Sequence, residues 1–344
     1  MSIRITNLTK RFGSHPAVDD LSVDIAADEF FAIVGASGCG KSTLLRLIAG
    51  LEAADSGQIR LHGAAVTATG LHVAPEARNI GFVFQSYALW PHLDVRGNVA
   101  FPAETAGLTR AEARARADRH LATVALTPFA DRRPAELSGG QRQRVALARC
   151  LAQEARTILM DEPLANLDPH LRTAMEGELL QFHKTAGATT IYITHDQREA
   201  MAVADRMAVM AAGRFLQVGP PADIYDAPAS EAVARFIGQG AVVDVELRSG
   251  QARLAGTPLP LRGLSGPEGK RRAMLRPADL APCPADTPGA LAGRVTAALY
   301  RGGHSEASVT VDGIDTPLHL HLTQRVRPGD SLHILAQGGW LIPA

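Results

Sequence analysis

A short glycine-rich segment that ends in lysine and serine carries the residue types that bind phosphate groups. It consists of Gly35, Ala36, Ser37, Gly38, Cys39, Gly40, Lys41 and Ser42, followed by Thr43. Glycines let backbone N–H groups turn inward around phosphate oxygens, Lys41 adds a positive charge, and the Ser42 hydroxyl can ligate magnesium. The spacing matches G-x-x-x-x-G-K-[ST], which requires a strand before the loop and a helix after it. The segment predicts a nucleotide-phosphate site, with a glycine-rich turn that binds nothing as the alternative.

Two acidic residues and one histidine stand where apolar runs end. Asp161 and Glu162 close the run that begins at Ile158, and His195 closes the run that begins at Tyr192. In open α/β sheets, ligands bind beyond the carboxyl ends of the strands. Paired acids at a strand end are often only solvated, and a lone histidine is more often a packed or surface residue. A phosphate loop in the same sheet favours roles for all three at the nucleotide.

A third segment, Leu137 to Gln141, offers a second phosphate-binding end between the other two motifs. Ser138 is placed as the N-cap of a helix that continues through Arg142 to Leu147. Gly139 and Gly140 would therefore expose backbone N–H groups at the start of that helix, where anions bind.

The elements that must position these residues follow an α/β pattern up to Gly238. Short apolar runs alternate with helical stretches, which indicates strands and crossover helices. The core strands are predicted at Phe30 to Val34, Asn79 to Gln85, Thr157 to Asp161 and Thr189 to His195. A helix is predicted at Thr43 to Ala49, and a mostly helical insertion at about 86–156. Within the insertion, Thr109 and Glu112 have capping-box spacing ahead of a helical stretch that runs to Leu126.

The chain changes character after Gly238-Gln239-Gly240. Short segments alternate apolar and polar residues, as in Val243 to Leu247, and proline and glycine turns separate them. We therefore expect a first domain over residues 1–238 and a small all-β domain over residues 239–344.

Histidines and cysteines are the residue types that most often ligate transition metals. The period of two places His319 and His321 on one strand face, where a metal pair is conceivable, but alternating polar residues normally form the wet side of a half-buried strand. Cys39, Cys150 and Cys283 lie far apart without paired spacing, which argues against a zinc site or a disulfide framework and fits a reducing compartment. No iron site is expected in this chain, because its histidines show no recurrent ligand spacing.

Length and charge limit the class of protein. The 344 residues suffice for two domains, and lysine plus arginine equals aspartate plus glutamate at 35 each. A nucleic-acid partner is not expected, because no overall basic field is present. The N-terminal segment Met1 to Thr6 lacks the apolar core of a signal peptide, and no apolar run approaches the roughly 20 residues that span a bilayer. At a membrane, another chain would have to supply the spans.

The phosphate loop, the Leu137 to Gln141 segment and the acidic pair, in this order, resemble the ATP-binding subunit of ATP-binding cassette (ABC) transporters. The resemblance covers nearly the whole chain. It implies an α/β fold, namely a P-loop ABC ATPase domain with a helical subdomain, followed by a small all-β, OB-like C-terminal domain. It also implies ATP hydrolysis with ATP and Mg2+ as cofactors.

The same resemblance implies a role for each site residue. Asp161 holds magnesium directly or through water, Glu162 polarises the attacking water, and His195 contacts the γ-phosphate as the switch histidine. Gln85 senses magnesium and the water at the hinge to the helical subdomain, although a glutamine after a strand means little by itself. Phe12 corresponds to the aromatic residue that stacks on adenine and, without the other motifs, would be assigned to the core. Every catalytic position is filled, which argues against a degenerate sensor of nucleotide.

A homodimer is the implied assembly. In the family, two subunits pack head to tail, and the signature segment of each closes over the ATP of its partner. The signature residues are Ser138, Gly139, Gly140 and Gln141. The segment Leu164 to Asp168 occupies the D-loop position, where Asn166 replaces a common alanine and Asp168 is retained. We expect cross-talk between the two sites to survive this change.

Further stretches resemble importers. Ser86 to Phe101 looks like the region of binding-protein-dependent importers that forms part of a groove for a helix of the membrane subunit, although such an aromatic cluster can also be core. Leu275 to Leu280 and Arg327 to Asp330 resemble the C-terminal regulatory domain of sugar, polyamine, sulfate and iron importers. The implied partners are two membrane-spanning permease subunits and a periplasmic or lipid-anchored solute-binding protein. The implied location is the cytoplasmic face of the bacterial inner membrane, as a peripheral protein.

The cargo is the least specified property. The chain looks most like the ferric-iron importers of bacteria in three segments: Tyr300 to His304, the junction from Phe236 to Gly240, and the sequence of the phosphate loop. Import of phosphonate, polyamine or sulfate is the alternative, because these stretches can be turns and strand ends without cargo information. A soluble regulatory ABC ATPase of ribosomes or DNA would be expected to carry two cassettes, a basic arm or a long coiled coil, and the sequence has none of these.

Overall fold

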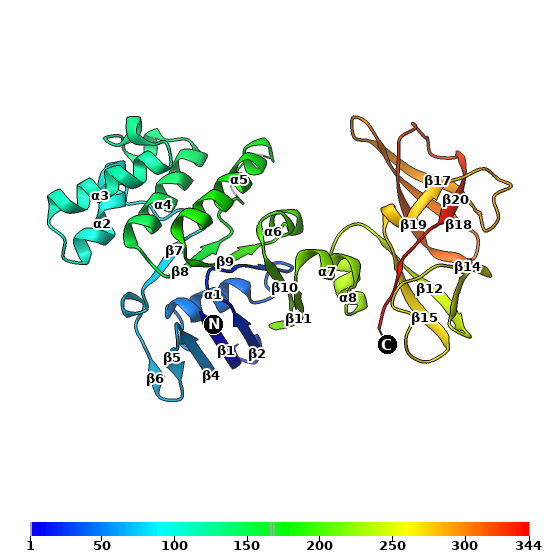
Figure 1. Ribbon diagram of the computed structural model, residues 1–344, viewed down its shortest axis with the longest axis horizontal. Helices are drawn as coiled ribbons and strands as arrows, with labels where there is room; N and C mark the ends of the chain where they lie inside the picture. Colours follow the sequence, from blue (N-terminus) through cyan, green and yellow to red (C-terminus); the bar gives the residue numbers. More distant parts are fainter. Residues whose placement is uncertain (1, 166, 168, 344) are drawn as a thin grey trace. The chain divides into compact units, whose positions relative to one another are not determined.

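The computed structural model describes residues 2–165, 167 and 169–343 and is drawn in Figure 1. Its internal contacts define two compact units, Met1–Pro221 and Ala222–Ala344. The division falls at the start of α7 (Pro221–Asp226), so that α7 and α8 (Glu231–Phe236) group with the C-terminal unit. The proposed functional boundary at Gly238 remains a prediction.

A six-stranded sheet forms the centre of the first unit. Its order is β11 (Arg214–Gly219), β10 (Arg206–Ala211), β3 (Phe30–Val34), β9 (Thr189–Thr194), β8 (Thr157–Asp161) and β7 (Ile80–Val83). Neighbouring strands from β10 to β7 pair in parallel, and β11 pairs antiparallel with β10. Strands β3 and β9 are buried along their whole length, as is typical of parallel strands covered on both faces. This arrangement confirms the α/β fold.

The four predicted core strands are present with small differences at their ends. β3 and β8 have the predicted bounds, and β9 ends at Thr194, one residue before His195. β7 is shorter than the predicted stretch: Asn79 adopts a positive φ of 50°, and the pairing with β8 stops at Val83. Gln85 therefore lies in the loop that follows the strand.

A second, antiparallel sheet packs around the helix that follows the phosphate loop. Its order is β2 (His15–Ile25), β1 (Ile3–Phe12), β4 (Ser56–Leu61), β5 (Ala64–Ala68) and β6 (Leu71–His72). Helix α1 (Lys41–Ala49) begins two residues before the predicted start and buries Leu44 and Ile48 in a core shared by both sheets. Burial of one such side chain contributes roughly 1.5–3 kcal/mol, so α1 holds the loop that precedes it in a fixed position.

The remaining helices of the first unit are of two kinds. Two accompany the central sheet, namely α5 (Pro169–Ala186) and α6 (Gln197–Val203). Three form a helical region with an apolar core of its own, namely α2 (Val95–Thr105), α3 (Arg110–Thr123) and α4 (Gly139–Gln153). Short 3-10 turns occur at Pro75–Ala77, Thr127–Phe129 and Pro134–Glu136. The helical insertion expected between the second and third core strands is therefore present.

Helix α3 has the predicted start signal but an earlier end. Thr109 and Glu112 form the capping box, with the Thr109 N–H donating to Glu112 Oε2 at 2.9 Å. The helix ends at Thr123 instead of continuing to Leu126, because Ala125 adopts a positive φ of 54°. Leu126 is nevertheless fully buried in the helical core, which explains why its apolar side chain extended the predicted helical pattern.

Over its described residues, the second unit is all-β except for α7, α8 and a 3-10 turn at Pro277–Asp279. One sheet has the order β14 (Thr257–Leu259), β13 (Gln251–Leu254), β12 (Ala241–Arg248), β15 (Gly269–Leu275) and β21 (Trp340–Leu341). The other has the order β16 (Leu280–Pro282), β20 (Ser331–Ala336), β17 (Leu291–Tyr300), β18 (Ser305–Val311) and β19 (Ile314–Leu322). Side chains of both sheets share a single apolar core, which confirms the expected small β domain of the OB-like kind.

In the part of the chain that the structure describes, no helix combines the length and the apolar character that crossing a membrane requires.

Candidate nucleotide site

The phosphate loop joins β3 to α1 in a conformation that requires glycine at two positions. A Cβ at Gly35 would lie 2.2 Å from the Met210 carbonyl oxygen, and a Cβ at Gly40 would lie 1.9 Å from the Ala17 carbonyl oxygen. Gly40 also has a φ of 108° and precedes the first residue of α1. The N-terminus of α1 therefore faces the loop, and its unpaired N–H groups are available to an anion.

The Lys41 side chain is folded into this loop. Its ammonium group donates hydrogen bonds to the carbonyl oxygens of Gly35 at 2.8 Å and Ala36 at 3.1 Å, and the residue is only 5% exposed. Its third N–H points at Cys39 Sγ at 3.8 Å. The loop thus fixes the position of the charge, and phosphate oxygens would replace some of these partners, because an ammonium group has three N–H donors.

Ser42 and Asp161 come together from the first turn of α1 and the end of β8. The Ser42 hydroxyl donates a hydrogen bond to Asp161 Oδ1 at 2.9 Å. Burial raises the pKa of Asp161, with the charge of Glu162 adding to that effect, whereas the hydrogen bond from Ser42 opposes it. A hydroxyl and a carboxylate oxygen at one point form the donor set that magnesium prefers, so the pair fits this ion.

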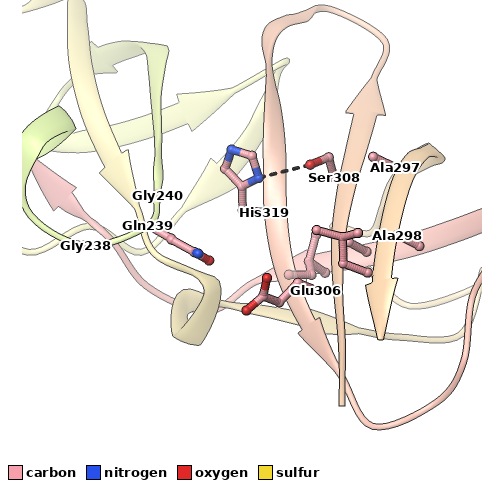
Figure 2. Close-up of a pocket in the computed structure, with 11 residues that line it drawn as sticks. Gly238, Gln239, Gly240, Ala297, Ala298, Glu306, Ser308 and His319 are labelled. Atoms are coloured by element: carbon pink, nitrogen blue, oxygen red, sulfur yellow. Dashed lines mark hydrogen bonds between the residues drawn. The ribbon is translucent and has the colours of Figure 1, made fainter. Parts of the chain in front are cut away.

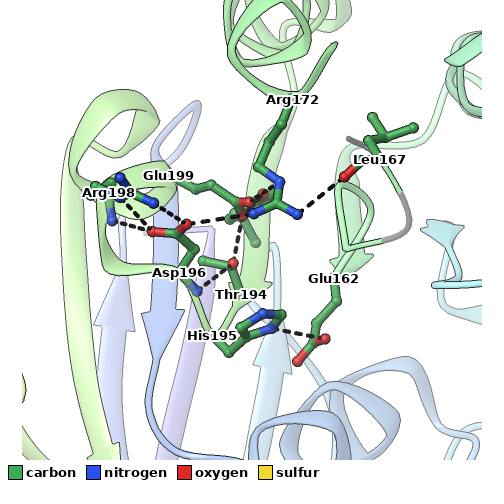
Figure 3. A network of polar contacts seen from close by, with 9 residues as sticks. Glu162, Leu167, Arg172, Thr194, His195, Asp196, Arg198 and Glu199 are labelled. Atoms are coloured by element: carbon green, nitrogen blue, oxygen red, sulfur yellow. Dashed lines mark hydrogen bonds and ion pairs between the residues drawn. The ribbon is translucent and has the colours of Figure 1, made fainter. Parts of the chain in front are cut away.

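Glu162 and His195 form a second pair at the same edge of the sheet. His195 Nδ1 lies 3.2 Å from Glu162 Oε2 (Figure 3). The Glu162 N–H donates to the carbonyl oxygen of Ile193 at 3.0 Å. Glu162 has a positive φ of 45°, which is strained for a side chain of this size and turns the chain sharply after β8. The two residues predicted to act on the water and the γ-phosphate are thus in contact.

A buried polar network holds the strand end that carries His195. The Glu199 carboxylate, only 3% exposed, accepts hydrogen bonds from Tyr192 Oη at 2.8 Å and Thr194 Oγ1 at 2.5 Å. Thr194 Oγ1 in turn accepts the Asp196 N–H at 3.0 Å (Figure 3). These contacts fix the backbone on both sides of His195 and limit the positions that its ring can take.

Arg172 of α5 connects this network to the segment that follows the acidic pair. Its guanidinium donates to the Leu167 carbonyl oxygen at 3.2 Å and makes ion pairs with Glu199 at 3.4 Å and Asp196 at 3.7 Å (Figure 3). Sequence reasoning did not single out Arg172, Thr194 or Glu199. The available signal was an acidic residue, Glu199, four positions after His195, in the first turn of the helix that follows the strand.

Two other predicted residues lie at exposed positions. Gln85 follows β7, and since β7 pairs in parallel with β8, it emerges at the same sheet edge as Asp161. Phe12 ends β1 and is 52% exposed, with the Lys10 ammonium 5.3 Å from its ring centroid. Phe12 is therefore not part of the core, and its ring is accessible to a stacking partner; its role at adenine stays a prediction.

The signature segment begins α4, in the helical region with its separate core. Ser138 is the N-cap as predicted: its Oγ accepts the Gln141 N–H at 3.3 Å, and its own N–H donates to Gln141 Oε1 at 2.9 Å. Ser138 is exposed, so the start of this helix can face another molecule. Asn166 and Asp168, the D-loop residues, lie outside the described residues.

Comparisons with known proteins agree with this geometry. The family model described as "ABC transporter" matches residues 18–165. The chain is 44% identical over 315 residues to a spermidine/putrescine import ATP-binding protein of Pseudomonas fluorescens, covering 88% of this chain and 86% of that protein. It is 42% identical over 315 residues to an Fe(3+) ions import ATP-binding protein of Rhizobium etli, covering 90% and 88%.

Further similarities extend over the whole chain and to solved structures. The chain is 41% identical over 350 residues to a sulfate/thiosulfate import ATP-binding protein of Gloeobacter violaceus, covering 100% of this chain and 96% of that protein. It also resembles an ATP-binding cassette solved as a dimer in a post-hydrolysis state with ADP and Pi. That likeness has a TM-score of 0.56 and 31% identity, and covers 64% of this chain and 98% of the other.

Proposed function

Since this chain belongs to the ABC transporter family, as an ATP-hydrolysing subunit of an importer, we propose that it energises ferric-iron uptake from the cytoplasmic face of a bacterial inner membrane. In this proposal, two copies of the chain bind two membrane-spanning permease subunits, and a periplasmic or lipid-anchored binding protein delivers the solute. The chain itself supplies the binding and hydrolysis of ATP.

The observation that carries the proposed chemistry is the contact between His195 and Glu162, 3.2 Å apart. A water oxygen attacks the γ-phosphorus of ATP, the bond to the bridging β–γ oxygen breaks, and ADP leaves with the electron pair. Glu162 accepts the proton of the attacking water, while His195 orients the Glu162 carboxylate and contacts the γ-phosphate.

The phosphate side of the reaction falls to the loop and the first turn of α1. Backbone N–H groups from Gly35 to Thr43 surround the phosphates, and Lys41 supplies positive charge to the β- and γ-oxygens. Ser42 and Asp161, with Gln85 at the same sheet edge, would hold magnesium, which when bound neutralises charge on the phosphate oxygens. Phe12 would stack on the adenine ring.

Two nucleotide sites per homodimer follow from the position of the signature segment. Ser138 to Gln141 form an anion-binding helix start, and we place it over the γ-phosphate bound by the other subunit. The dimeric cassette of similar fold supports this arrangement. Closing of the dimer on ATP and its opening after hydrolysis would then drive the permease.

A concentration series tests the shared site. ATP hydrolysis by the purified chain should rise more steeply than linearly with protein concentration and should be lost in Ser138→Arg. Ala135→Arg, an exposed residue before the signature, is the matched control for the added charge and should retain activity. Linear turnover that Ser138→Arg leaves unchanged would show that each chain hydrolyses ATP alone.

A variant of the acidic pair tests the assigned base. Glu162→Gln keeps the shape of the side chain but cannot accept a proton, so turnover should fall by about 10²–10⁴-fold. ATP binding, measured with a fluorescent analogue, should persist, and gel filtration with ATP should show a trapped dimer. Steady hydrolysis in this variant would assign the base to another residue.

The proposed permease contact is a groove of about 1130 Å³ in the first unit. Its lining includes Phe84, Trp90, Pro91, Phe101, Arg149 and Gln153. Trp90 and Phe101 are 44% and 41% exposed, and their rings lie 5.8 Å apart. Large aromatic side chains at this degree of exposure are more typical of an interaction site than of a core.

The cargo assignment rests on two observations. The segments Tyr300 to His304 and Phe236 to Gly240 resemble the sequences of ferric-iron importers, and one relative is named for iron import. Relatives named for polyamine and sulfate import have 44% and 41% identity, against 42% for the iron-importing relative, so these cargoes are the alternatives. Proteoliposomes that contain this chain with its permease should accumulate radioactive iron in an ATP-dependent manner when the binding protein is supplied. Accumulation of spermidine or sulfate instead would reject iron and leave the ATPase assignment intact.

A further inference from the structure

Three side chains from two neighbouring strands and the turn before them converge on the outward face of the second sheet of the C-terminal unit. His304 precedes β18, Glu306 lies within β18, and His321 lies within β19. One possible ligand atom of each lies within 4.8 Å of those of the other two. The rings of His304 and His321 have centroids 5.3 Å apart.

Strand register and a tight turn produce this convergence. Glu306 pairs directly with His321, so their side chains stand beside each other on the same face. A two-residue turn of Gly302 and Gly303, with φ of 78° and 135°, brings His304 back to the strands, where Arg301 N–H donates to its carbonyl oxygen at 2.9 Å.

We propose that His304, Glu306 and His321 bind a divalent transition-metal ion, with Zn2+ as the representative ion. Two imidazoles and one carboxylate suit zinc, cobalt, nickel and iron(II), whereas calcium and magnesium prefer oxygen ligands alone. Ligand atoms around a tetrahedral ion at about 2.1 Å lie about 3.4 Å from one another. A spacing within 4.8 Å therefore needs only small rotations of the three exposed or half-buried side chains.

An existing ion pair competes with the metal. Arg301 Nε lies 3.0 Å from Glu306 Oε2, and the arginine side chain is 54% exposed. Exposed ion pairs contribute little to stability, so a metal ion can displace this arginine at small cost. The positive charge of Arg301 should nevertheless weaken the binding of a cation by this cluster. If the cluster is a metal site, removing that charge should therefore strengthen metal binding.

The cluster borders a cavity of about 310 Å³ in the same unit. Figure 2 shows the side chains of Gln239, Glu306 and His319 around this cavity. His319 shares the face of His321, as the alternation predicts, but its Nδ1 lies 3.2 Å from the Ser308 hydroxyl. We therefore assign His319 to the cavity wall and not to the ligand set, and coordination positions that the protein leaves open can be filled by water or a small anion.

Competition with a chromophoric zinc chelator tests the site, using the untagged, nucleotide-free full chain. Wild-type protein should bind one Zn2+ per chain, and Co2+ should give the visible absorption bands of a nitrogen- and oxygen-ligated ion. His304→Ala, His321→Ala and Glu306→Gln should each weaken Zn2+ binding by at least about 10-fold. Mutation of residues that only hydrogen-bond to a metal ligand already lowers metal affinity by this factor, so loss of a ligand should cost at least as much. Arg301→Gln should strengthen binding several-fold.

His72→Ala is the matched control, because His72 is an exposed histidine of β6 in the other unit and should leave binding unchanged. Circular dichroism checks that each variant is folded, and the Co2+ spectrum of Arg301→Gln supplies a readout that does not depend on losing a ligand. Unchanged zinc affinity in a His304→Ala/His321→Ala double variant, or an Arg301→Gln variant with weaker binding, would overturn the proposal.

Discussion

Arg172 Nη2 donates a hydrogen bond to the carbonyl oxygen of Leu167 at 3.2 Å, while the same guanidinium pairs with the carboxylate of Glu199. One side chain thus links the segment after the acidic pair to the strand end that carries His195. Because Glu199 also accepts the Thr194 hydroxyl, a shift of Arg172 would be transmitted to the backbone next to the histidine. We interpret Arg172 as a positioning residue for the hydrolytic pair.

Arg172→Gln should lower kcat for ATP hydrolysis by at least about 10-fold, because small displacements of reacting groups have effects of this size. The KM for ATP should change little, since Arg172 lies outside the phosphate loop. Arg198→Gln is the control, as this arginine also pairs with Asp196 but its side chain is 84% exposed. An equal loss in both variants, or a change in KM alone, would contradict a positioning role.

Gly40→Ala should abolish ATP binding and destabilise the first unit. A Cβ at this position would lie 1.9 Å from the Ala17 carbonyl oxygen, and the φ of 108° is itself unfavourable for alanine. Gly38→Ala shares the positive φ, 79°, but its Cβ would meet open space, so only the strain of about 1–2 kcal/mol remains. Thermal unfolding and nucleotide titration of both variants separate the steric clash from the backbone strain.

His120 should make stability depend on pH. Burial, with Arg119 adding to it, lowers the pKa of His120 below 6.5 in the folded protein. The His120 side chain then binds a proton more tightly in the unfolded chain than in the folded protein. Its contribution to the free energy of unfolding is therefore fully present above the pKa of His120 in the unfolded chain, and it is lost as the pH falls through the pKa of His120 in the folded protein. Thermal melts between pH 7.5 and 5 should show a larger decline for wild type than for His120→Gln. Parallel declines would assign the pH dependence to other groups.

Arg276 should hold α7 and α8 to the β-sheet within the second unit. Its guanidinium donates to the carbonyl oxygens of Tyr225, at 3.0 Å, and Ile237, and it lies over the Tyr225 ring at 4.4 Å. Arg276→Met would leave both carbonyls unpaired, at a cost of about 2–4 kcal/mol in the free energy of unfolding. Arg276→Lys should recover only part of this, because lysine cannot reproduce the planar two-point contact. Chemical denaturation provides the comparison.

The elements that local sequence specifies were predictable. The phosphate loop is recognisable from the spacing of its own glycines, lysine and serine, and the apolar runs around Ile33 and Leu159 are long enough to indicate buried parallel strands. The Ser138 cap and the Thr109 capping box are likewise set within a few residues. Such signals require no knowledge of distant contacts, so the sequence determines them directly.

Features that depend on strand register or helix packing were not predictable in the same way. Arg172 occurs in a helix where an arginine usually lies on the solvated face, and only the fold brings it to Glu199. The histidines showed no recurrent ligand spacing, yet His304 and His321 lie close together because β18 pairs with β19 in one particular register. Their proximity is a property of the sheet and not of any short segment.

The position of Lys41 has a consequence for selectivity. Its ammonium group already donates to two carbonyl oxygens of the loop. When a phosphate binds, hydrogen bonds to phosphate oxygens therefore replace bonds to the loop, and the net gain per bond is small. A single weak anion such as chloride gains little from such an exchange. A polyphosphate, which engages the helix start and the lysine together, can compensate for it, and the loop therefore discriminates by the number of oxygens a ligand presents.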